Sequence, residues 1–145
     1  MTAKLSTVKR LMRARDLQRQ MAAAETHTAQ AFVTQAETAV ASCAAALQHT
    51  DRQTAAHLQG EIDVNQLDTL ARARTAAHTA HVRAGAALSQ ASQALTHALA
   101  LLQVAETKVR QSETIRDTVH EAMTAASERK LQAALDDFSL RKVRQ

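Results

Sequence analysis

Proline is absent from this 145-residue chain, which has only two glycines, two phenylalanines and one cysteine, and no tryptophan or tyrosine. Without proline, nothing stops a helix by removing an amide hydrogen. With aromatic residues at 1%, a thick globular core is excluded, because such a core needs large side chains to fill it. Cys43 has no second cysteine in the chain, so an intrachain disulfide is excluded.

Strong helix formers dominate what is present. Hydrophobic residues reach 46%, and much of this is alanine, accompanied by leucine, glutamine, arginine and methionine. A length of 145 residues suggests one domain. We therefore expect an all-α, elongated protein with a single coiled-coil domain over residues 1–145.

The clearest break in the chain is the stretch from Gly60 to Asn65. Gly60 suits the position after a helix C-terminus, because a residue without Cβ tolerates a left-handed conformation. Asp63 and Asn65 are both good N-caps for a following helix. The sequence thus predicts an antiparallel hairpin, with a first helix over about 3–58, a turn over 59–65 and a second helix over about 66–143.

Apolar residues recur at alternating spacings of 3 and 4 in both predicted helices, which is typical of a coiled-coil seam. In the first helix the seam is Leu5, Val8, Met12, Ala22, Ala29, Val33, Ala36, Val40, Cys43 and Leu47. In the second it is Leu67, Leu70, Ala77, Ala84, Leu88, Ala91, Leu95, Ala98, Leu102, Ala105, Val109, Val119, Met123, Ala126 and Ala133. The first seam falters at Arg15 and Arg19, where we expect the helix to fray or to pair elsewhere.

A turn centred near residue 62 predicts that facing residues have numbers that sum to about 125. The second helix is then longer than the first, and residues from about Val119 onward project beyond the N-terminus with no partner in the chain. This overhang still carries the apolar residues Met123, Leu131, Leu135, Phe138, Leu140 and Val143. An unpaired apolar stripe of this kind favours contact with another protein.

Gly85 falls inside the second predicted helix. In a helix interior, glycine costs roughly 1 kcal/mol relative to alanine. It either allows close packing or is simply tolerated, and a second turn that gives three helices is the alternative.

Charge is concentrated toward the two ends of the chain. Residues 1–20 hold six basic and one acidic side chain, and residues 128–145 hold five basic and three acidic ones, within a net charge of +4. In a hairpin both basic segments belong to the open end. They form either a solvated face or a docking surface for acidic protein, and nucleic acid is the weakest of the three alternatives.

Signatures of catalysis, metal binding or membrane insertion are missing. The chain has no Gly-rich phosphate loop, nucleophile elbow or Cys/His metal signature, and its carboxylates are scattered. His78 and His81 share a helical face, but no carboxylate or thiol completes a metal site. With no signal peptide or transmembrane stretch, we expect a cytoplasmic non-enzyme without cofactor or metal.

Two stretches of the sequence resemble one known family. Residues 4–15 (KLSTVKRLMRAR) are similar to the start of YscO-type secretion proteins. The end of the chain is similar to the C-terminal basic and acidic pattern of FliJ, in Glu128-Arg129-Lys130-Leu131, Asp136-Asp137-Phe138 and Arg141-Lys142. The chain thus resembles the FliJ/YscO/HrpO family, the stalk proteins of type III secretion ATPases.

The resemblance implies a coiled-coil stalk that docks in the pore of the hexameric secretion ATPase and links it to the export gate protein. Such a protein is peripherally associated with the inner-membrane export apparatus, and some members also bind chaperones of secreted effectors. Carried over to this chain, the ATPase-binding residues are Lys9, Arg10, Arg13, Asp137, Phe138, Leu140 and Arg141. The gate-binding residues are Leu67 and Leu70, just after the turn.

Two other functions compete with the stalk. One is a generic coiled-coil adaptor or a homodimer in which two hairpins form a four-helix bundle, because two Ala-rich helices alone bury little area. The other is an amphipathic helix on anionic lipid, which the absence of tryptophan and the narrow apolar stripe disfavour.

Overall fold

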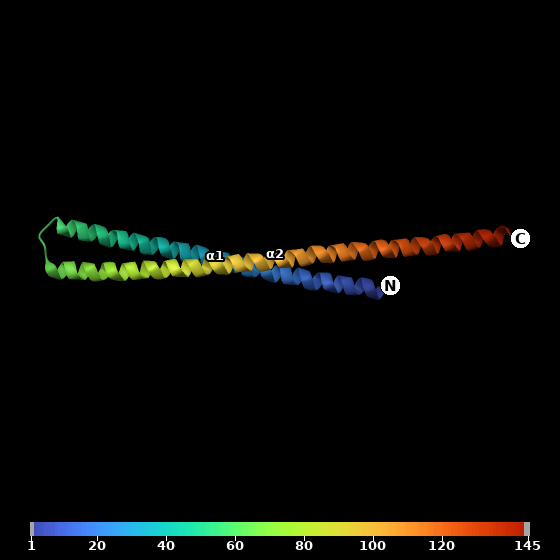
Figure 1. The fold of residues 1–145 in the computed structure, drawn as a ribbon, viewed down its shortest axis with the longest axis horizontal. Helices are drawn as coiled ribbons and strands as arrows, with labels where there is room; N and C mark the ends of the chain where they lie inside the picture. The colour runs from blue at the N-terminus through green and yellow to red at the C-terminus, as the bar shows by residue number, and fades with distance from the viewer. Residues whose placement is uncertain (1, 144–145) are drawn as a thin grey trace. The chain divides into compact units, whose positions relative to one another are not determined.

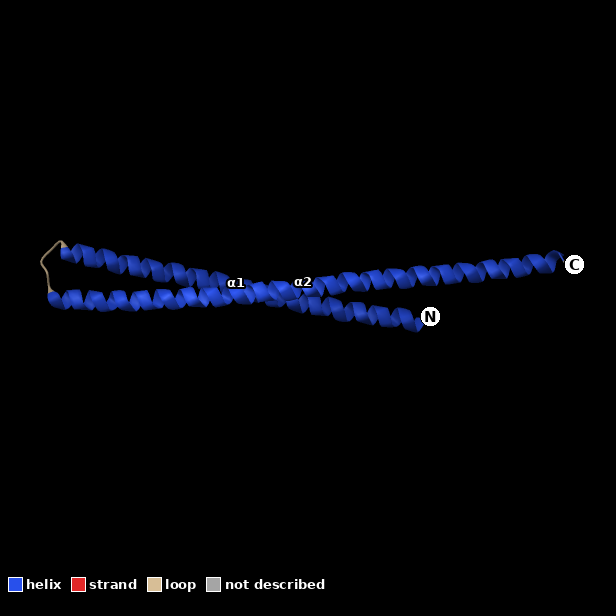
Figure 2. Ribbon diagram, viewed as in Figure 1, coloured by secondary structure: helices blue, strands red, loops and turns tan. Residues whose placement is uncertain are grey.

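The computed structural model describes residues 2–143, and the side chains of residues 4–142. Within these residues it contains no strand and two α-helices: α1 covers Thr2–Leu58 and α2 covers Val64–Val143. The two helices pack against each other and run in opposite directions from the turn (Figure 1), which confirms the predicted all-α hairpin. Figure 2 shows loop only between the two helices.

The chain divides into two compact units, and each helix contributes to both. The turn unit is formed by Ala23–Leu101, and the terminal unit by Met1–Ala22 together with Leu102–Gln145. The prediction of one domain over residues 1–145 stays a prediction.

The end of α1 differs from the one predicted. Gln59 N–H donates to the Ala56 carbonyl and Gly60 N–H to the His57 carbonyl, both at 3.3 Å. These are bonds between residues three apart, which tighten the last turn of a helix and need no left-handed residue. No described residue, glycine included, has a positive φ. The prediction of a left-handed Gly60 is therefore wrong.

The start of α2 is set by Asp63. Its carboxylate Oδ1 accepts the Asn65 N–H at 2.9 Å, and its carbonyl accepts the first helical bond, from Leu67 N–H at 3.0 Å. Asp63 is thus the N-cap, and the predicted alternative, Asn65, lies inside the first turn. Because Asp63 comes first in the chain, α2 begins two residues before the predicted start at residue 66.

The seam positions are the least exposed part of the hairpin, as predicted. Every predicted seam residue of α1 is buried or half-buried, and so is every one of α2 except Ala133. Val8, Val33 and Ala98 are the only apolar side chains with an exposed fraction of 9% or less among those described. The core is therefore a single thin layer between two helices.

Cross-helix contacts confirm the predicted register. In the turn unit, Arg74 Nε donates to Asp51 Oδ1 at 2.6 Å, and these residue numbers sum to 125. In the terminal unit, Arg15 donates from Nη1 to the Lys108 carbonyl at 2.7 Å and to Ser112 Oγ at 2.8 Å, and these sums lie on either side of 125. The register found from the turn thus holds in both units.

The charged seam positions of α1 do not break the helix. Arg15 is half-buried and reaches across to α2, whereas Arg19 turns outward and pairs with Asp16 one turn away at 2.7 Å. Of the two expected alternatives, fraying is therefore wrong, because Arg15 finds its acceptors on the facing helix, whereas Arg19 does pair elsewhere.

Gly85 lies in an unbroken stretch of α2, which excludes a second turn and a third helix in this region. A Cβ added at Gly85 would meet nothing within 4 Å. Close packing is therefore not the reason for this glycine, which is tolerated in an open position.

Candidate functional site

The end of α2 extends past the part of the terminal unit that α1 covers. Met123, Ala125 and Ala126 are still half-buried, whereas every residue over 127–142 is exposed. This confirms an overhang, but one that starts about eight residues later than the predicted Val119, because α1 begins at Thr2 and covers α2 to about residue 123. We call residues 127–142 the C-terminal extension. It includes Ala133, which explains why this predicted seam residue is exposed.

Three large apolar side chains form one stripe along the C-terminal extension. Leu131, Leu135 and Phe138 are spaced by 4 and 3 residues, so they lie on one face of the helix. Their exposed fractions are 64%, 53% and 66%. We call these three residues the apolar stripe. A stripe of this length with no partner in the described chain has the form of one half of a helix-in-groove contact.

The apolar stripe does not continue the hairpin seam. Continuing the seam from Ala126 at spacings of 4 and 3 gives Lys130, Ala133, Asp137 and Leu140. Leu140 follows Phe138 by two residues, which is a rotation of about 200° around the helix. The extension therefore presents two faces, one with the apolar stripe and one with Leu140, and the predicted overhang residues do not act as a single stripe. The side chain of Val143 lies outside the described residues.

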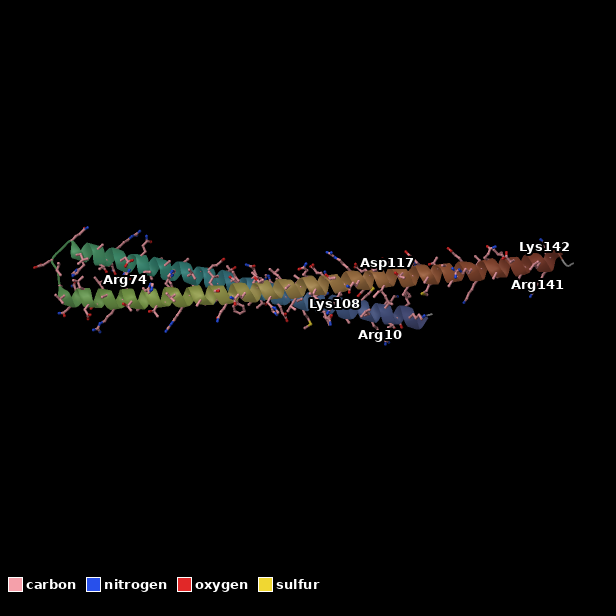
Figure 3. All side chains as sticks on the ribbon, viewed as in Figure 1. Arg10, Arg74, Lys108, Asp117, Arg141 and Lys142 are labelled. Atoms are coloured by element: carbon pink, nitrogen blue, oxygen red, sulfur yellow. The ribbon has the colours of Figure 1, made fainter. Side chains whose placement is uncertain are left out.

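Charged residues flank both faces. Arg141 and Lys142 are exposed in the last turn of α2 (Figure 3), where cations are favoured by the helix dipole. Asp136 and Asp137 are both exposed, and Asp136 accepts a bond from Gln132 Nε2 at 3.0 Å. The end of α2 thus combines apolar anchors with cations that can meet a carboxylate on another molecule.

The other predicted ATPase-binding residues lie on α1. Lys9, Arg10 and Arg13 are exposed there, and Figure 3 shows Arg10 well apart from Arg141 and Lys142. The register places Arg10 beside about residue 115 of α2, which is 23 residues before Phe138. At 1.5 Å per residue, they are roughly 35 Å apart along the helix. The predicted set therefore forms two separate groups rather than one cluster.

The predicted gate-binding residues belong to the seam. Leu67 and Leu70 are half-buried, and Leu70 lines a shallow groove of about 550 Å³ with His57 and Thr69. The more exposed apolar residues near the turn are Ile62 at 59% and Val64 at 75%. These two were missed because the seam pattern does not include them, although large β-branched residues at the turn and at the start of α2 are a signal in themselves.

A larger groove in the turn unit was also missed. It has a volume of about 900 Å³ and is lined by both helices, with Phe32 and Leu101 among its walls. The corresponding signal in the sequence is a row of alanines beside the seam. It was not recognised because alanine is also common in helices that make no further contact.

No metal site or membrane span is found in residues 2–143. No group of three or more His, Cys, Asp or Glu side chains there is placed to hold an ion. Neither helix contains an apolar stretch that could cross a membrane. His81 Nδ1 is buried with no hydrogen-bond partner, and its ring occupies a seam position among half-buried neighbours.

Comparisons with protein-family models, curated proteins and solved structures found no match to this chain. Functional inference therefore rests on the residues and their geometry.

Proposed function

We propose that this chain is a stalk protein of the type III secretion kind, which docks in a hexameric secretion ATPase and couples it to an export gate. The observation that carries the proposal is the apolar stripe, three large apolar side chains that are more than half exposed on a helical segment with no partner among the described residues. In this proposal the protein acts at the cytoplasmic face of the export apparatus and has no catalysis of its own.

The extension is suited to docking because it is already helical. Binding a preformed helix avoids most of the entropic cost of ordering a segment on contact. Phe138 is the strongest anchor, since aromatic side chains that fill a pocket dominate the energy of most interfaces. Leu131 and Leu135 add apolar area beside it, and Leu140 meets the opposite wall of a surrounding pore.

The basic residues contribute attraction to an acidic ring. Arg141 sits at the end of the extension, whereas Lys9, Arg10 and Arg13 form a second basic group on α1. Two groups spaced along one unit fit a pore with acidic residues at two depths. Their electrostatic contribution acts mainly on the rate and orientation of docking.

The turn is the proposed contact with the gate protein. Leu67 and Leu70 are half-buried, so Ile62 and Val64 would make the first contact and the two leucines would support it. Chaperones of secreted effectors are further proposed partners, without an assigned surface.

The test is ATP hydrolysis by the secretion ATPase of the same organism, with and without this protein. We expect stimulation that Phe138→Ala reduces by about tenfold or more in apparent affinity, as expected for an interface anchor worth 2 kcal/mol or so. Val82→Ala is the control, because Val82 is also an exposed apolar residue of α2, at 56%, in the other unit.

Three outcomes are informative. Stimulation that Phe138→Ala loses and Val82→Ala keeps supports docking through the extension. Stimulation that is equal in both variants retains the stalk but removes the extension as its contact. Absence of both stimulation and co-elution with the ATPase would rule out the proposed function.

A further inference from the structure

The two flanks of the hairpin seam in the turn unit differ in polarity. On one flank, the positions adjoining the seam are spaced by seven residues, and eight of the eleven are apolar: Phe32, Ala39 and Ala46 on α1, and Ala73, Ala80, Ala87, Ala94 and Leu101 on α2. The opposite flank carries Glu37, Asp51 and His78 together with the apolar Leu58 and Leu99. We call the first the alanine flank. Apolar residues at the seam plus one flank are typical of helices in a bundle, not of a two-stranded coiled coil.

The groove of about 900 Å³ lies on the alanine flank. Eight of its fifteen lining residues are alanines, so its floor is shallow enough for another helix to approach closely. Phe32 stands in it with 59% of its surface exposed and Leu101 with 45%. All the lining residues fall between Ala24 and Leu101, so the groove belongs to the turn unit alone.

The hairpin leaves too much surface uncovered for its mass. The chain exposes 11307 Å², whereas a folded monomer of 15.7 kDa exposes about 7300 Å² by the usual scaling. The excess is about 4000 Å². A standard interface buries roughly 1600 Å² in total, or about 800 Å² from each partner. The excess surface of this chain is therefore more than enough to supply one such interface.

We propose that the groove is filled by the same groove of a second copy, so that two hairpins form a four-helix bundle. The proposed two-fold axis runs along the helices, and α1 of each copy packs against α2 of the other. Neighbouring helices are then antiparallel throughout, which is the favourable arrangement of their dipoles. The register puts Phe32 level with Ala94, so each Phe32 meets a small residue of the other copy.

The polar residues of the groove also match in this arrangement. Glu25 and His97 are the only ionisable residues in the lining, and they lie at the same end. The two-fold axis brings Glu25 of one copy beside His97 of the other, where a carboxylate can accept a hydrogen bond from the imidazole. A groove with a single formal charge favours a largely apolar surface over a strongly charged partner.

The inference does not depend on the proposed stalk function, because its residues are in the turn unit and the apolar stripe is in the terminal unit. Sedimentation equilibrium of the full chain over a wide concentration range should give twice the 15.7 kDa chain mass. Phe32→Gln should weaken association by at least about tenfold, as expected for a central aromatic anchor. Phe138→Gln, which changes the other exposed phenylalanine, should leave the mass unchanged.

A second variant protects the test against misfolding. Ala94→Gln adds a bulky but helix-favouring side chain to the groove, so we expect full helicity by circular dichroism and the same weakened association. A monomer at all concentrations with intact helicity would overturn the proposal, as would association that neither Phe32→Gln nor Ala94→Gln weakens.

Disulfide cross-linking tests the axis. Gln35 and Gln90 line the groove from different helices, and their helical positions put them on its opposite edges within one chain. Mixing Gln35→Cys with Gln90→Cys, each in a Cys43→Ser background, should give a covalent mixed dimer on a non-reducing gel. Cross-linking of Gln35→Cys only to itself would overturn the proposed axis.

Discussion

The most deeply buried side chain of the described residues is polar. Ser112 has an exposed fraction of 1%. Its Oγ donates to the Lys108 carbonyl at 2.9 Å and accepts a bond from Arg15 at 2.8 Å. Ser112 occupies a seam position, where a large apolar residue would stabilise the packing of α1 against α2 through burial. Polar groups at a seam position fix the register of a coiled coil at some cost in stability.

We predict a measurable coupling between Arg15 and Ser112. In a double-mutant cycle with Arg15→Ala and Ser112→Ala, the pair should show a coupling free energy of roughly 1 to 2 kcal/mol, the range for a hydrogen bond with a charged donor. Thermal unfolding at fixed protein concentration measures it. Strictly additive effects would mean that the contact contributes nothing to stability.

Gly85 offers a stabilising substitution. A Cβ there has only open space around it, and alanine is favoured over glycine in a helix interior by about 1 kcal/mol. Gly85→Ala should therefore raise the melting temperature by a few degrees, about 3 °C for a chain of this size. Ser89→Ala, one turn further on the exposed side, is the control and should change stability by less. A lower melting temperature for Gly85→Ala would indicate a contact that the structure does not contain.

The start of α2 depends on one capping side chain. Asp63 accepts the Asn65 N–H, and His57 Nε2 lies 3.3 Å from the Asp63 amide nitrogen, so the end of α1 also contacts the cap. Asp63→Ala should lower the free energy of unfolding by about 1 kcal/mol. Glu61→Ala is the matched control, because Glu61 is an exposed acid of the same turn. Equal effects of the two variants would show that the cap is not specific.

The C-terminal extension should be separable from the hairpin. Residues 127–142 are exposed throughout, so deletion of residues 128–145 removes no side chain that the structure describes as packed. We expect the shortened chain to keep its helicity per residue and to melt within a few degrees of the full chain, while binding to the ATPase is lost. Circular dichroism and co-elution with the ATPase measure the two effects. Loss of helix throughout the shortened chain would contradict a separate docking role.

The sequence predicted the two helices and the turn well, but it predicted the exposed faces of the helices less well. The hairpin, its register and its seam followed from the Gly60–Asn65 break and the 3 and 4 spacing, since both are local signals. The choice between Asp63 and Asn65 as N-cap could not be made, because both side chains can cap a helix. Ser112 was missed because a search for apolar periodicity passes over polar seam residues.

The faces beside the seam were harder to predict, because their meaning depends on what the facing helix presents. The alanine flank emerges only when the heptad positions of both helices are compared at one register. The apolar stripe of the extension was grouped with Leu140 because these residues are close along the chain. Their angular positions around the helix, which put Leu140 on another face, were not compared.

Docking through charged residues and self-association through apolar area should respond differently to salt. The basic groups on α1 and at the end of α2 should contribute screened, long-range attraction to an acidic ATPase pore, whereas the alanine flank is nearly uncharged. Raising the salt concentration from about 0.1 M to about 1 M shortens the Debye length from about 10 Å to about 3 Å. We expect docking to the ATPase to weaken by about tenfold or more over this range, chiefly through a slower association rate.

Self-association through the groove should hold or strengthen with salt, because apolar burial does not depend on screening. Surface plasmon resonance measures the salt response of docking to the ATPase, and sedimentation equilibrium measures that of self-association. Self-association that weakens with salt would mean that the contact of Glu25 with His97, and not apolar burial, dominates the bundle interface. Salt-insensitive docking would assign the ATPase contact to the apolar stripe without the basic groups.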